Sequence, residues 1–333
     1  MRLKVNKDGL GALPLQRDSV EDAVKLIRGC IDAGIDFIDT ARAYSDSEEK
    51  LGLALDGYVP REKLTIATKT GAGNAEDFWA HLETSLRLLK TDYADVYQFH
   101  NPAYVPRPGD ENGLYDAALK AKAQGKIRRI GFTNHRLAVA TEAVKSGLYE
   151  TLQFPFSYLA SDSEIELVRL CKERDVDFIA MKALSGGLIT DIGAARAWLN
   201  QYDNVIPIWG LQHYRELELL TEAAKSPVQG LTPERSAKIA LDRTELLGEF
   251  CRGCGYCMPC PEEIQIHMCA RTSLLLRRSP TTYLLSPDWY KEMAKIDKCR
   301  ECGLCASRCP YGLDTPALLK KNWEDYKEQY PKV

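Results

Sequence analysis

Two cysteine runs near the end of the chain decide how its C-terminal part folds: Cys251-Arg-Gly-Cys254-Gly-Tyr-Cys257-Met-Pro-Cys260-Pro261 and Cys299-Arg-Glu-Cys302-Gly-Leu-Cys305-Ala-Ser-Arg-Cys309-Pro310. Cysteine at every third residue lets a loop surround one cubane cluster with three thiolates, and the cysteine before proline ligates the cluster of the other run. The spacing therefore predicts two [4Fe-4S] clusters. The expected ligands are Cys251, Cys254, Cys257 and Cys309 for the first, and Cys299, Cys302, Cys305 and Cys260 for the second.

The first run departs from the usual spacing, because two residues rather than three separate Cys257 from Cys260, which leaves the cluster of Cys260 open. Two other readings of the cysteines fit less well. Structural zinc prefers two well-separated cysteine pairs, and disulfides are typical of small secreted domains. Cys269, Cys30 and Cys171 lie outside the pattern, and the last two are predicted to be small buried hydrophobic residues.

Length and charge bound the remaining possibilities. A chain of 333 residues can form a large single-core domain with a smaller appendage. The near balance of 44 Lys and Arg against 47 Asp and Glu argues against nucleic acid or a membrane surface as the main partner. No apolar run is long enough for a membrane span, and the first residues lack a targeting core. We therefore expect a cytoplasmic protein, and a homo-oligomer is left open.

Between residues 10 and 225, strand-like apolar runs alternate with amphipathic helix-like segments, a pattern typical of parallel strands joined by helices. The expected strands are Leu10–Leu15, Ile35–Asp39, Leu64–Thr68, Asp95–Phe99, Ile127–Phe132, Leu152–Pro155, Asp177–Met181 and Val205–Ile208. The expected helices include Ser19–Ala33, Asn74–Leu89, Gly113–Ala123, Glu164–Arg174 and His213–Ala224. Eight such units predict an α/β fold, a (β/α)8 TIM barrel, with a site at the carboxyl ends of its strands.

The barrel is expected to occupy residues 1–226 and a C-terminal α-helical, ferredoxin-like iron–sulfur domain residues 227–333. Thr232 and Pro233 are typical of a helix start, which predicts a helix to about Gly248. A helical tail is expected over Thr315–Tyr330.

Polar residues stand where three successive expected strands finish. Asp39, Lys69 and His100 lie one strand–helix unit apart, and Tyr44 follows Asp39 by five residues. In this hypothesis Asp39 holds Lys69, the ammonium lowers the Tyr44 pKa, and His100 orients a carbonyl oxygen. Each residue alone has a structural explanation, such as a turn cap or a surface charge. Their common position at one rim favours catalysis.

At these residues the chain resembles the aldo-keto reductase superfamily, in the branch with a C-terminal ferredoxin-like extension. The shared motifs are Phe37-Ile-Asp39-Thr-Ala-Arg-Ala-Tyr44, Thr68-Lys69, Gln98-Phe-His100 and Ile130-Gly-Phe-Thr-Asn134. The resemblance implies that Asp39, Tyr44, Lys69 and His100 form the catalytic tetrad. It also implies that Thr133, Asn134 and Gln153 hold the nicotinamide carboxamide, and that Ser185, Gly186 and Gly187 form the pyrophosphate loop.

Two departures concern the cofactor. Met181 stands where family members commonly place an aromatic ring against the nicotinamide. The segment after Pro207 lacks the usual basic residues for the 2′-phosphate of NADP, and a strong preference for NADPH would require another basic residue, such as Lys182 or Arg215, to read it. The cofactor is therefore expected to be either NADPH or NADH.

The resemblance implies an oxidoreductase acting on a small carbonyl or alcohol substrate. Hydride transfer moves two electrons at once whereas a cluster moves one, and the sequence has no flavin fingerprint. The clusters are therefore structural, serve a ferredoxin-type electron carrier, or serve a substrate reduced one electron at a time. The alternative function is an iron–sulfur electron-transfer protein whose nicotinamide site has lapsed.

Overall fold

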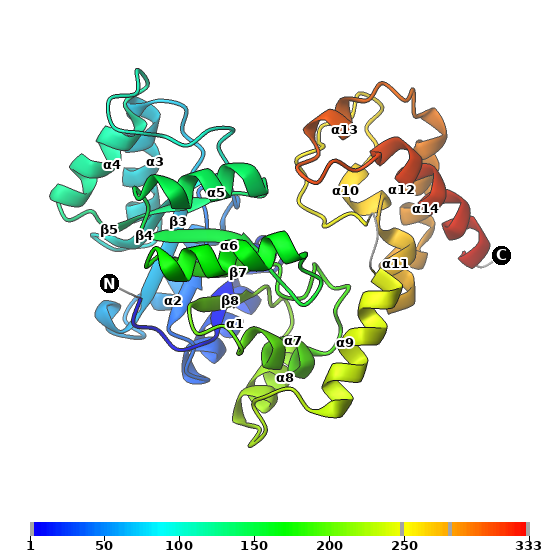
Figure 1. Ribbon diagram of the computed structural model, residues 1–333, viewed down its shortest axis with the longest axis horizontal. Helices are drawn as coiled ribbons and strands as arrows, with labels where there is room; N and C mark the ends of the chain where they lie inside the picture. Colours follow the sequence, from blue (N-terminus) through cyan, green and yellow to red (C-terminus); the bar gives the residue numbers. More distant parts are fainter. Residues whose placement is uncertain (1–2, 247–249, 279–281, 331–333) are drawn as a thin grey trace. The chain divides into compact units, whose positions relative to one another are not determined.

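The computed structural model describes residues 3–246, 250–278 and 282–330 (Figure 1). They form two compact units. The first comprises residues 1–183 and 195–231, and the second comprises residues 184–194 and 232–333. The short segment Leu184–Ala194 therefore groups with the C-terminal unit although it lies far upstream in the chain. The sequence did not anticipate this grouping.

The first unit is a closed barrel of eight parallel strands that pair in chain order, as predicted. The strands are β1 Gly9–Gly11, β2 Phe37–Asp39, β3 Thr65–Thr70, β4 Ala94–His100, β5 Ile127–Thr133, β6 Thr151–Pro155, β7 Asp177–Met181 and β8 Val205–Trp209. The first strand is shorter than expected. Pro14 begins a 3-10 helix over Pro14–Arg17 instead, because proline has no N–H for a sheet ladder.

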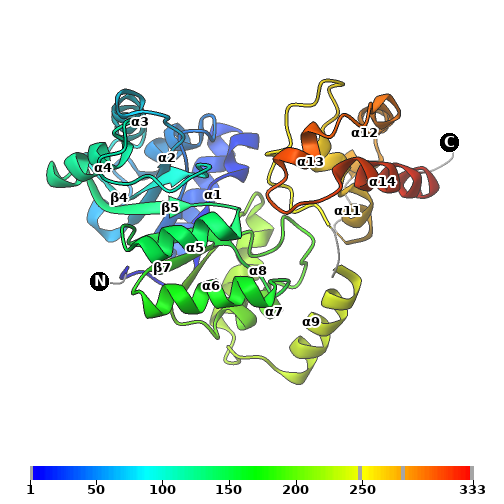
Figure 2. The same cartoon turned by 45° about the horizontal axis from the view of Figure 1, so that its top comes forward.

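Helices connect the strands on the outside of the barrel. They are α1 Val20–Asp32, α2 Ser47–Leu55, α3 Ala75–Leu88, α4 Leu114–Ala123, α5 Leu137–Ser146, α6 Asp162–Glu173, α7 Ile192–Leu199 and α8 Tyr214–Lys225, with a 3-10 turn at Arg61–Lys63. Ser19 and Asn74 cap α1 and α3 by accepting from backbone N–H groups. Helices α5 and α6 lie side by side outside the strands in both views (Figures 1 and 2).

Apolar side chains fill the barrel interior, including Phe37, Val96, Ile179 and Ile208. A polar contact closes the barrel beside them. The carboxylate of Asp8 accepts from Trp209 Nε1 at 2.9 Å and from Arg196 Nε at 2.8 Å. This pairing joins the residue before β1 to the end of β8, so the first and last strands are fixed together.

The second unit is helical, as predicted for the cysteine-rich part. Its helices are α9 Pro233–Leu246, α10 Ile266–Cys269, α11 Thr272–Arg278, α12 Pro287–Ala294, α13 Leu304–Arg308 and α14 Thr315–Gln329, with 3-10 turns at Thr282–Leu285 and Lys295–Lys298. The last residues of the helix expected to reach Gly248 lie outside the described residues. Trp289, Met293 and Tyr326 form part of its buried core. In the described part of the chain, no helix is both long and apolar enough to span a bilayer.

Candidate active site and cysteine pockets

Three neighbouring parallel strands bring the predicted catalytic residues to one end of the barrel. Asp39 is the last residue of β2, Lys69 lies near the end of β3, and His100 ends β4. Asp39 pairs in register with Ala67 and Lys69 with Gln98, so the side chains stand at successive levels of the same rim. Tyr44 lies on the loop between β2 and α2. All four residues therefore belong to the carboxyl ends of the strands, as predicted.

Asp39 and Lys69 form a buried ion pair. Nζ of Lys69 lies 2.7 Å from Oδ2 of Asp39 and donates a second hydrogen bond of 2.6 Å to the carbonyl of Thr40. The exposed fractions of the two side chains are 2% and 1%. Burial raises the pKa of Asp39 and lowers the pKa of Lys69, because it disfavours both charged forms, and the ion pair opposes both shifts.

Tyr44 and His100 lie next to this pair. Nζ of Lys69 is 4.9 Å from the centre of the Tyr44 ring, and the Tyr44 and His100 rings meet edge to face with centroids 5.7 Å apart. The prediction of a lowered Tyr44 pKa is wrong in this structure. Burial and the nearby Asp39 charge raise the pKa of Tyr44, so the phenol keeps its proton.

His100 is held in its neutral form. Burial and the positive charge of Lys69 lower the pKa of His100 to about 3. A neutral imidazole carries one N–H donor and one acceptor nitrogen. Beside a protonated Tyr44, it can therefore donate a hydrogen bond to a carbonyl oxygen without carrying charge.

A second layer of amides holds Asp39, and sequence reasoning assigned no role to one of them. Nε2 of Gln98 lies 3.2 Å from Oδ1 of Asp39 and 2.8 Å from Oε1 of Gln153. Nε2 of Gln153 lies 3.2 Å from Oδ2 of Asp39. Gln98 precedes His100 by two residues on β4, so strand periodicity places both on the same face. That spacing is the signal that could have found it.

The residues expected to hold the nicotinamide are buried in the first unit. The Thr133 hydroxyl donates to the carbonyl of Gln153 at 3.2 Å. The Asn134 amide donates to the carbonyl of Pro102 at 2.8 Å and accepts from the N–H of Arg136 at 2.8 Å. Met181, 9% exposed, packs with the apolar barrel interior. Lys182 follows it with a left-handed backbone, φ +60°.

Ser185, Gly186 and Gly187 form a loop of three consecutive left-handed residues, with φ of +48°, +66° and +94°. Successive left-handed positions turn the backbone tightly, and glycine adopts them without strain. This loop belongs to the second unit. Within that unit, the guanidinium of Arg271 donates to the carbonyls of Ser185 and Gly186.

The eight predicted cluster ligands line two pockets of the second unit. One pocket is lined by Cys251, Cys254, Cys257 and Cys309 together with Arg252, Tyr311 and apolar residues. The other is lined by Cys260, Cys299, Cys302 and Cys305, and Cys257 also reaches it. Within the described ranges, no three His, Cys, Asp or Glu side chains are close enough to hold a single metal ion. Thiols surrounding a wider space fit a multi-iron cluster.

Cys30, Cys171 and Cys269 lie outside both pockets and are fully buried. Burial raises the pKa of Cys30 and of Cys269 to about 12, so both thiols stay protonated. Cys30 and Cys171 lie on helices α1 and α6. The prediction that these two are buried hydrophobic residues is confirmed.

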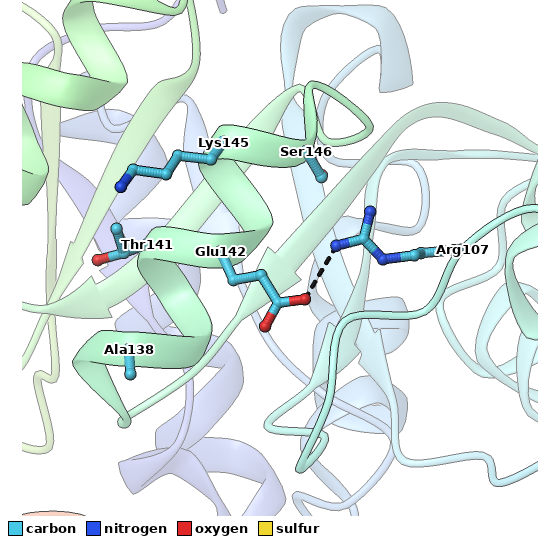
Figure 3. Close-up of a pocket in the computed structure, with 6 residues that line it drawn as sticks. All are labelled: Arg107, Ala138, Thr141, Glu142, Lys145 and Ser146. Atoms are coloured by element: carbon cyan, nitrogen blue, oxygen red, sulfur yellow. Dashed lines mark hydrogen bonds and ion pairs between the residues drawn. The ribbon is translucent and has the colours of Figure 1, made fainter.

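A surface hollow on the barrel unit is separate from the predicted site. It is lined by Arg107 and by Ala138, Thr141, Glu142, Lys145 and Ser146 of α5. Figure 3 shows Arg107 and Glu142 pointing toward one another, and they form an ion pair of 2.9 Å. Both side chains are about half exposed, so the pair is weak. No predicted site residue lines this hollow.

Comparison with known protein families shows which family the chain belongs to. Residues 9–229 match the aldo/keto reductase family. The chain belongs to the aldo/keto reductase family. Residues 250–314 of this aldo/keto reductase match the 4Fe-4S dicluster domain, which covers all eight cysteines of the two runs. The predicted resemblance is therefore confirmed for both parts.

Curated relatives of this family member match about half of the chain. Aldo-keto reductase YhdN of Bacillus subtilis is 31% identical over 185 residues, which are 50% of this chain and 54% of the relative. L-galactose dehydrogenase of Arabidopsis thaliana is 31% identical over 208 residues, 57% of this chain and 65% of the relative. The chain thus spans about half to two thirds of the length of the relatives it matches.

Solved structures show the same fold. An aldo-keto reductase from Bacillus halodurans (holo form) aligns with a TM-score of 0.62 at 22% identity, covering 72% of this chain and 93% of that one. An aldo-keto reductase from Klebsiella pneumoniae in complex with NADPH aligns with a TM-score of 0.61 at 24% identity, covering 72% and 92%. These similarities support the barrel fold of this aldo/keto reductase.

Proposed function

We propose that this protein is a nicotinamide-dependent oxidoreductase that reduces a small carbonyl substrate or oxidises the corresponding alcohol. The observation that carries the proposal is the buried Asp39–Lys69 pair beside a protonated Tyr44 and a neutral His100. Preorganised donors at the carboxyl ends of barrel strands are what carbonyl chemistry needs. Family membership supports the same class of reaction.

Each member of the tetrad has its own role in this proposal. Tyr44 donates its proton to the substrate oxygen in reduction, and accepts a proton in oxidation. His100 donates a hydrogen bond from its neutral ring and orients that oxygen. Lys69 lies over the face of the Tyr44 ring and stabilises the phenolate left after proton transfer. Asp39 holds Lys69 in place. A bound nicotinamide would supply the hydride to the carbonyl carbon, or accept it from the alcohol carbon.

For cofactor binding we propose the residues that the family resemblance implies. Thr133, Asn134 and Gln153 would hold the carboxamide, and Met181 would contact the ring. Lys182 and the loop residues Ser185, Gly186 and Gly187 would serve the phosphate-bearing part of the cofactor. The NADPH bound to the Klebsiella pneumoniae protein of the same fold supports a nicotinamide cofactor.

For the second unit we propose two [4Fe-4S] clusters with crossed ligation. Cys251, Cys254, Cys257 and Cys309 would hold the first, and Cys299, Cys302, Cys305 and Cys260 the second. The two pockets and the dicluster match support this assignment. Cys302 is exposed, which supports electron exchange with a ferredoxin-type carrier. Bound clusters would supply or accept single electrons there.

A specific observation favours the second candidate, an iron–sulfur electron-transfer protein without nicotinamide chemistry. The amides of Asn134 and Gln153 are already engaged by Pro102, Arg136, Asp39 and Gln98. A bound carboxamide would compete with these partners for the two amides.

Titration of the cluster-loaded protein with NADPH and NADH, followed by nicotinamide fluorescence, separates the two candidates. Saturable binding at micromolar concentration, lost in an Asn134→Ala variant that retains its iron, is expected for the reductase. Absence of binding for both cofactors, with both clusters reducible by a ferredoxin, would establish the electron-transfer protein instead.

A further inference from the structure

Arg271 is a buried cation that lies at the junction of two loops of the second unit. It precedes α11 directly and is only 4% exposed. Its guanidinium meets the loop Leu184–Ala194, where it donates to the carbonyls of Ser185 at 3.2 Å and of Gly186. A buried arginine needs such acceptors because an unpaired buried charge is costly.

The same guanidinium also meets the first cysteine run. Gly253, between Cys251 and Cys254, packs so closely that a Cβ there would overlap Nη1 of Arg271. At Gly186 a Cβ would stand 2.7 Å from the same atom. Both glycines have left-handed backbones, with φ of +65° and +66°. The loop 184–194 and the first cysteine loop therefore each place one glycine, Gly186 and Gly253, against the same guanidinium.

The position of Arg271 is itself fixed by helix packing. Oδ1 of Asn322 on α14 accepts from the N–H of Ser273 at 3.3 Å and from its hydroxyl at 2.9 Å, and its amide donates to the carbonyl of Ala270 at 3.1 Å. Leu275 of α11 lies 3.8 Å from a Cβ built at Gly187. The residues on both sides of Arg271 are therefore held in place by Asn322. An ordered first cysteine loop can thus stabilise the loop 184–194 through the guanidinium.

We infer that Arg271 is a positioning residue that ties the loop Leu184–Ala194 to the first cysteine loop, so that the affinity for the nicotinamide cofactor depends on the first cluster. The inference rests on the proposed function for its second half only. If the first cysteine loop is not ordered around its cluster, Gly253 no longer backs the guanidinium. The loop that carries Ser185, Gly186 and Gly187 is then held less firmly by its hydrogen bonds to Arg271.

Hydrogen exchange of the peptide 184–194 tests the tie without any nucleotide. Arg271→Met should raise its exchange rate about tenfold, the scale of one lost charge-assisted hydrogen bond. Arg271→Lys keeps the charge but cannot reach two carbonyls with a fork of donors, so it should restore part of the protection. Arg277→Met changes a half-exposed arginine on the same helix, paired with Asp325, and should leave the peptide unchanged.

The cluster side is tested by Cys254→Ala, which removes an expected ligand of the first cluster. In Cys254→Ala, the hydrogen-exchange rate of the peptide 184–194 should rise as it does in Arg271→Met. A variant that carries both substitutions should show no further rise. Unchanged exchange in Arg271→Met with full iron content would overturn the inference. If Arg271→Met fails to load iron, the Arg271→Lys variant provides the test. A wild-type exchange rate of the peptide 184–194 in iron-replete Arg271→Lys protein would also overturn the inference.

Nucleotide binding separates the inference from the proposed function. In cluster-loaded protein, Arg271→Met should weaken NADPH binding about tenfold, with partial rescue in Arg271→Lys and the EPR signals of both clusters retained. Wild-type NADPH affinity in Arg271→Met would overturn the link to the cofactor. If the wild-type protein binds no nucleotide while exchange in 184–194 still responds to Arg271→Met, the proposed function fails and the tie between the loops stands.

Discussion

Nζ of Lys69 lies 2.7 Å from Oδ2 of Asp39, and both side chains are almost completely buried. The ammonium also donates to the carbonyl of Thr40. With its donors directed to these acceptors, Lys69 meets Tyr44 through the ring face at 4.9 Å. The phenol of Tyr44 is therefore kept protonated by burial, and stabilisation by Lys69 gains importance when a phenolate forms during reaction.

Replacing Tyr44 by phenylalanine tests its role as proton donor. Tyr44→Phe keeps the ring that packs on His100 and Lys69, so cofactor affinity should stay near normal. Carbonyl reduction should fall about a hundredfold or more, which is typical of losing a general acid. Steady-state kinetics with a small aldehyde gives the measurement. Tyr58→Phe, at an exposed tyrosine that donates to Asp32, is the matched control, and turnover equal to wild type in Tyr44→Phe would remove the tetrad mechanism.

The low pKa of His100 predicts a pH dependence of stability. Its pKa of about 3 in the folded protein lies below the value of about 6.5 for an unperturbed histidine. Between these values the unfolded state binds more protons, so the contribution of neutral His100 is complete above about pH 6.5 and is lost as pH falls. Melting temperatures between about pH 5.5 and 7.5 should therefore decline less steeply in His100→Gln than in wild type. Equal slopes in the two proteins, with the exposed His213→Gln as control, would contradict the buried neutral state.

Discrimination between NADPH and NADH should be weak, within about tenfold, because no Lys or Arg stands in the usual place after Pro207 and the lost charge-assisted contact is worth a couple of kcal/mol. Arg215, a candidate reader of the 2′-phosphate, is 66% exposed and pairs with Glu218 at 3.0 Å on its own helix. Dissociation constants from fluorescence titration check this. A thousandfold preference for NADPH would show that a basic residue reads the phosphate, and Lys182→Met and Arg215→Met would then identify it.

Crossed ligation predicts the effect of losing a distant cysteine. Cys309→Ala should damage the cluster held chiefly by Cys251, Cys254 and Cys257, because Cys309 lines their pocket. Iron analysis should fall from about eight irons per chain, and EPR should show which cluster is lost. Cys269→Ala, at a buried cysteine outside both pockets, should keep its full iron content. Loss of the later cluster with the earlier one intact would mean that each run ligates its own cluster.

The sequence by itself determined the barrel, the helical cysteine-rich part and the rim on which Asp39, Lys69 and His100 stand. Strand and helix periodicities are local, and parallel strands in chain order bring their carboxyl ends to one rim. The strand ends therefore had to meet once the barrel closed. The cysteine spacing is equally local, because three of the four expected ligands of each cluster come from one run.

Only the tertiary structure decided the electrostatics and the long-range partners. The Tyr44 pKa is raised because burial and the nearby Asp39 charge both disfavour the phenolate, and the extent of burial depends on the whole barrel rather than on the loop that carries Tyr44. Gln98 joined the site because its amide reaches across two strands to Asp39 and Gln153. Leu184–Ala194 groups with the cysteine-rich unit and accepts hydrogen bonds from Arg271, more than eighty residues downstream. No periodicity records a contact between residues so far apart, so folding alone establishes it.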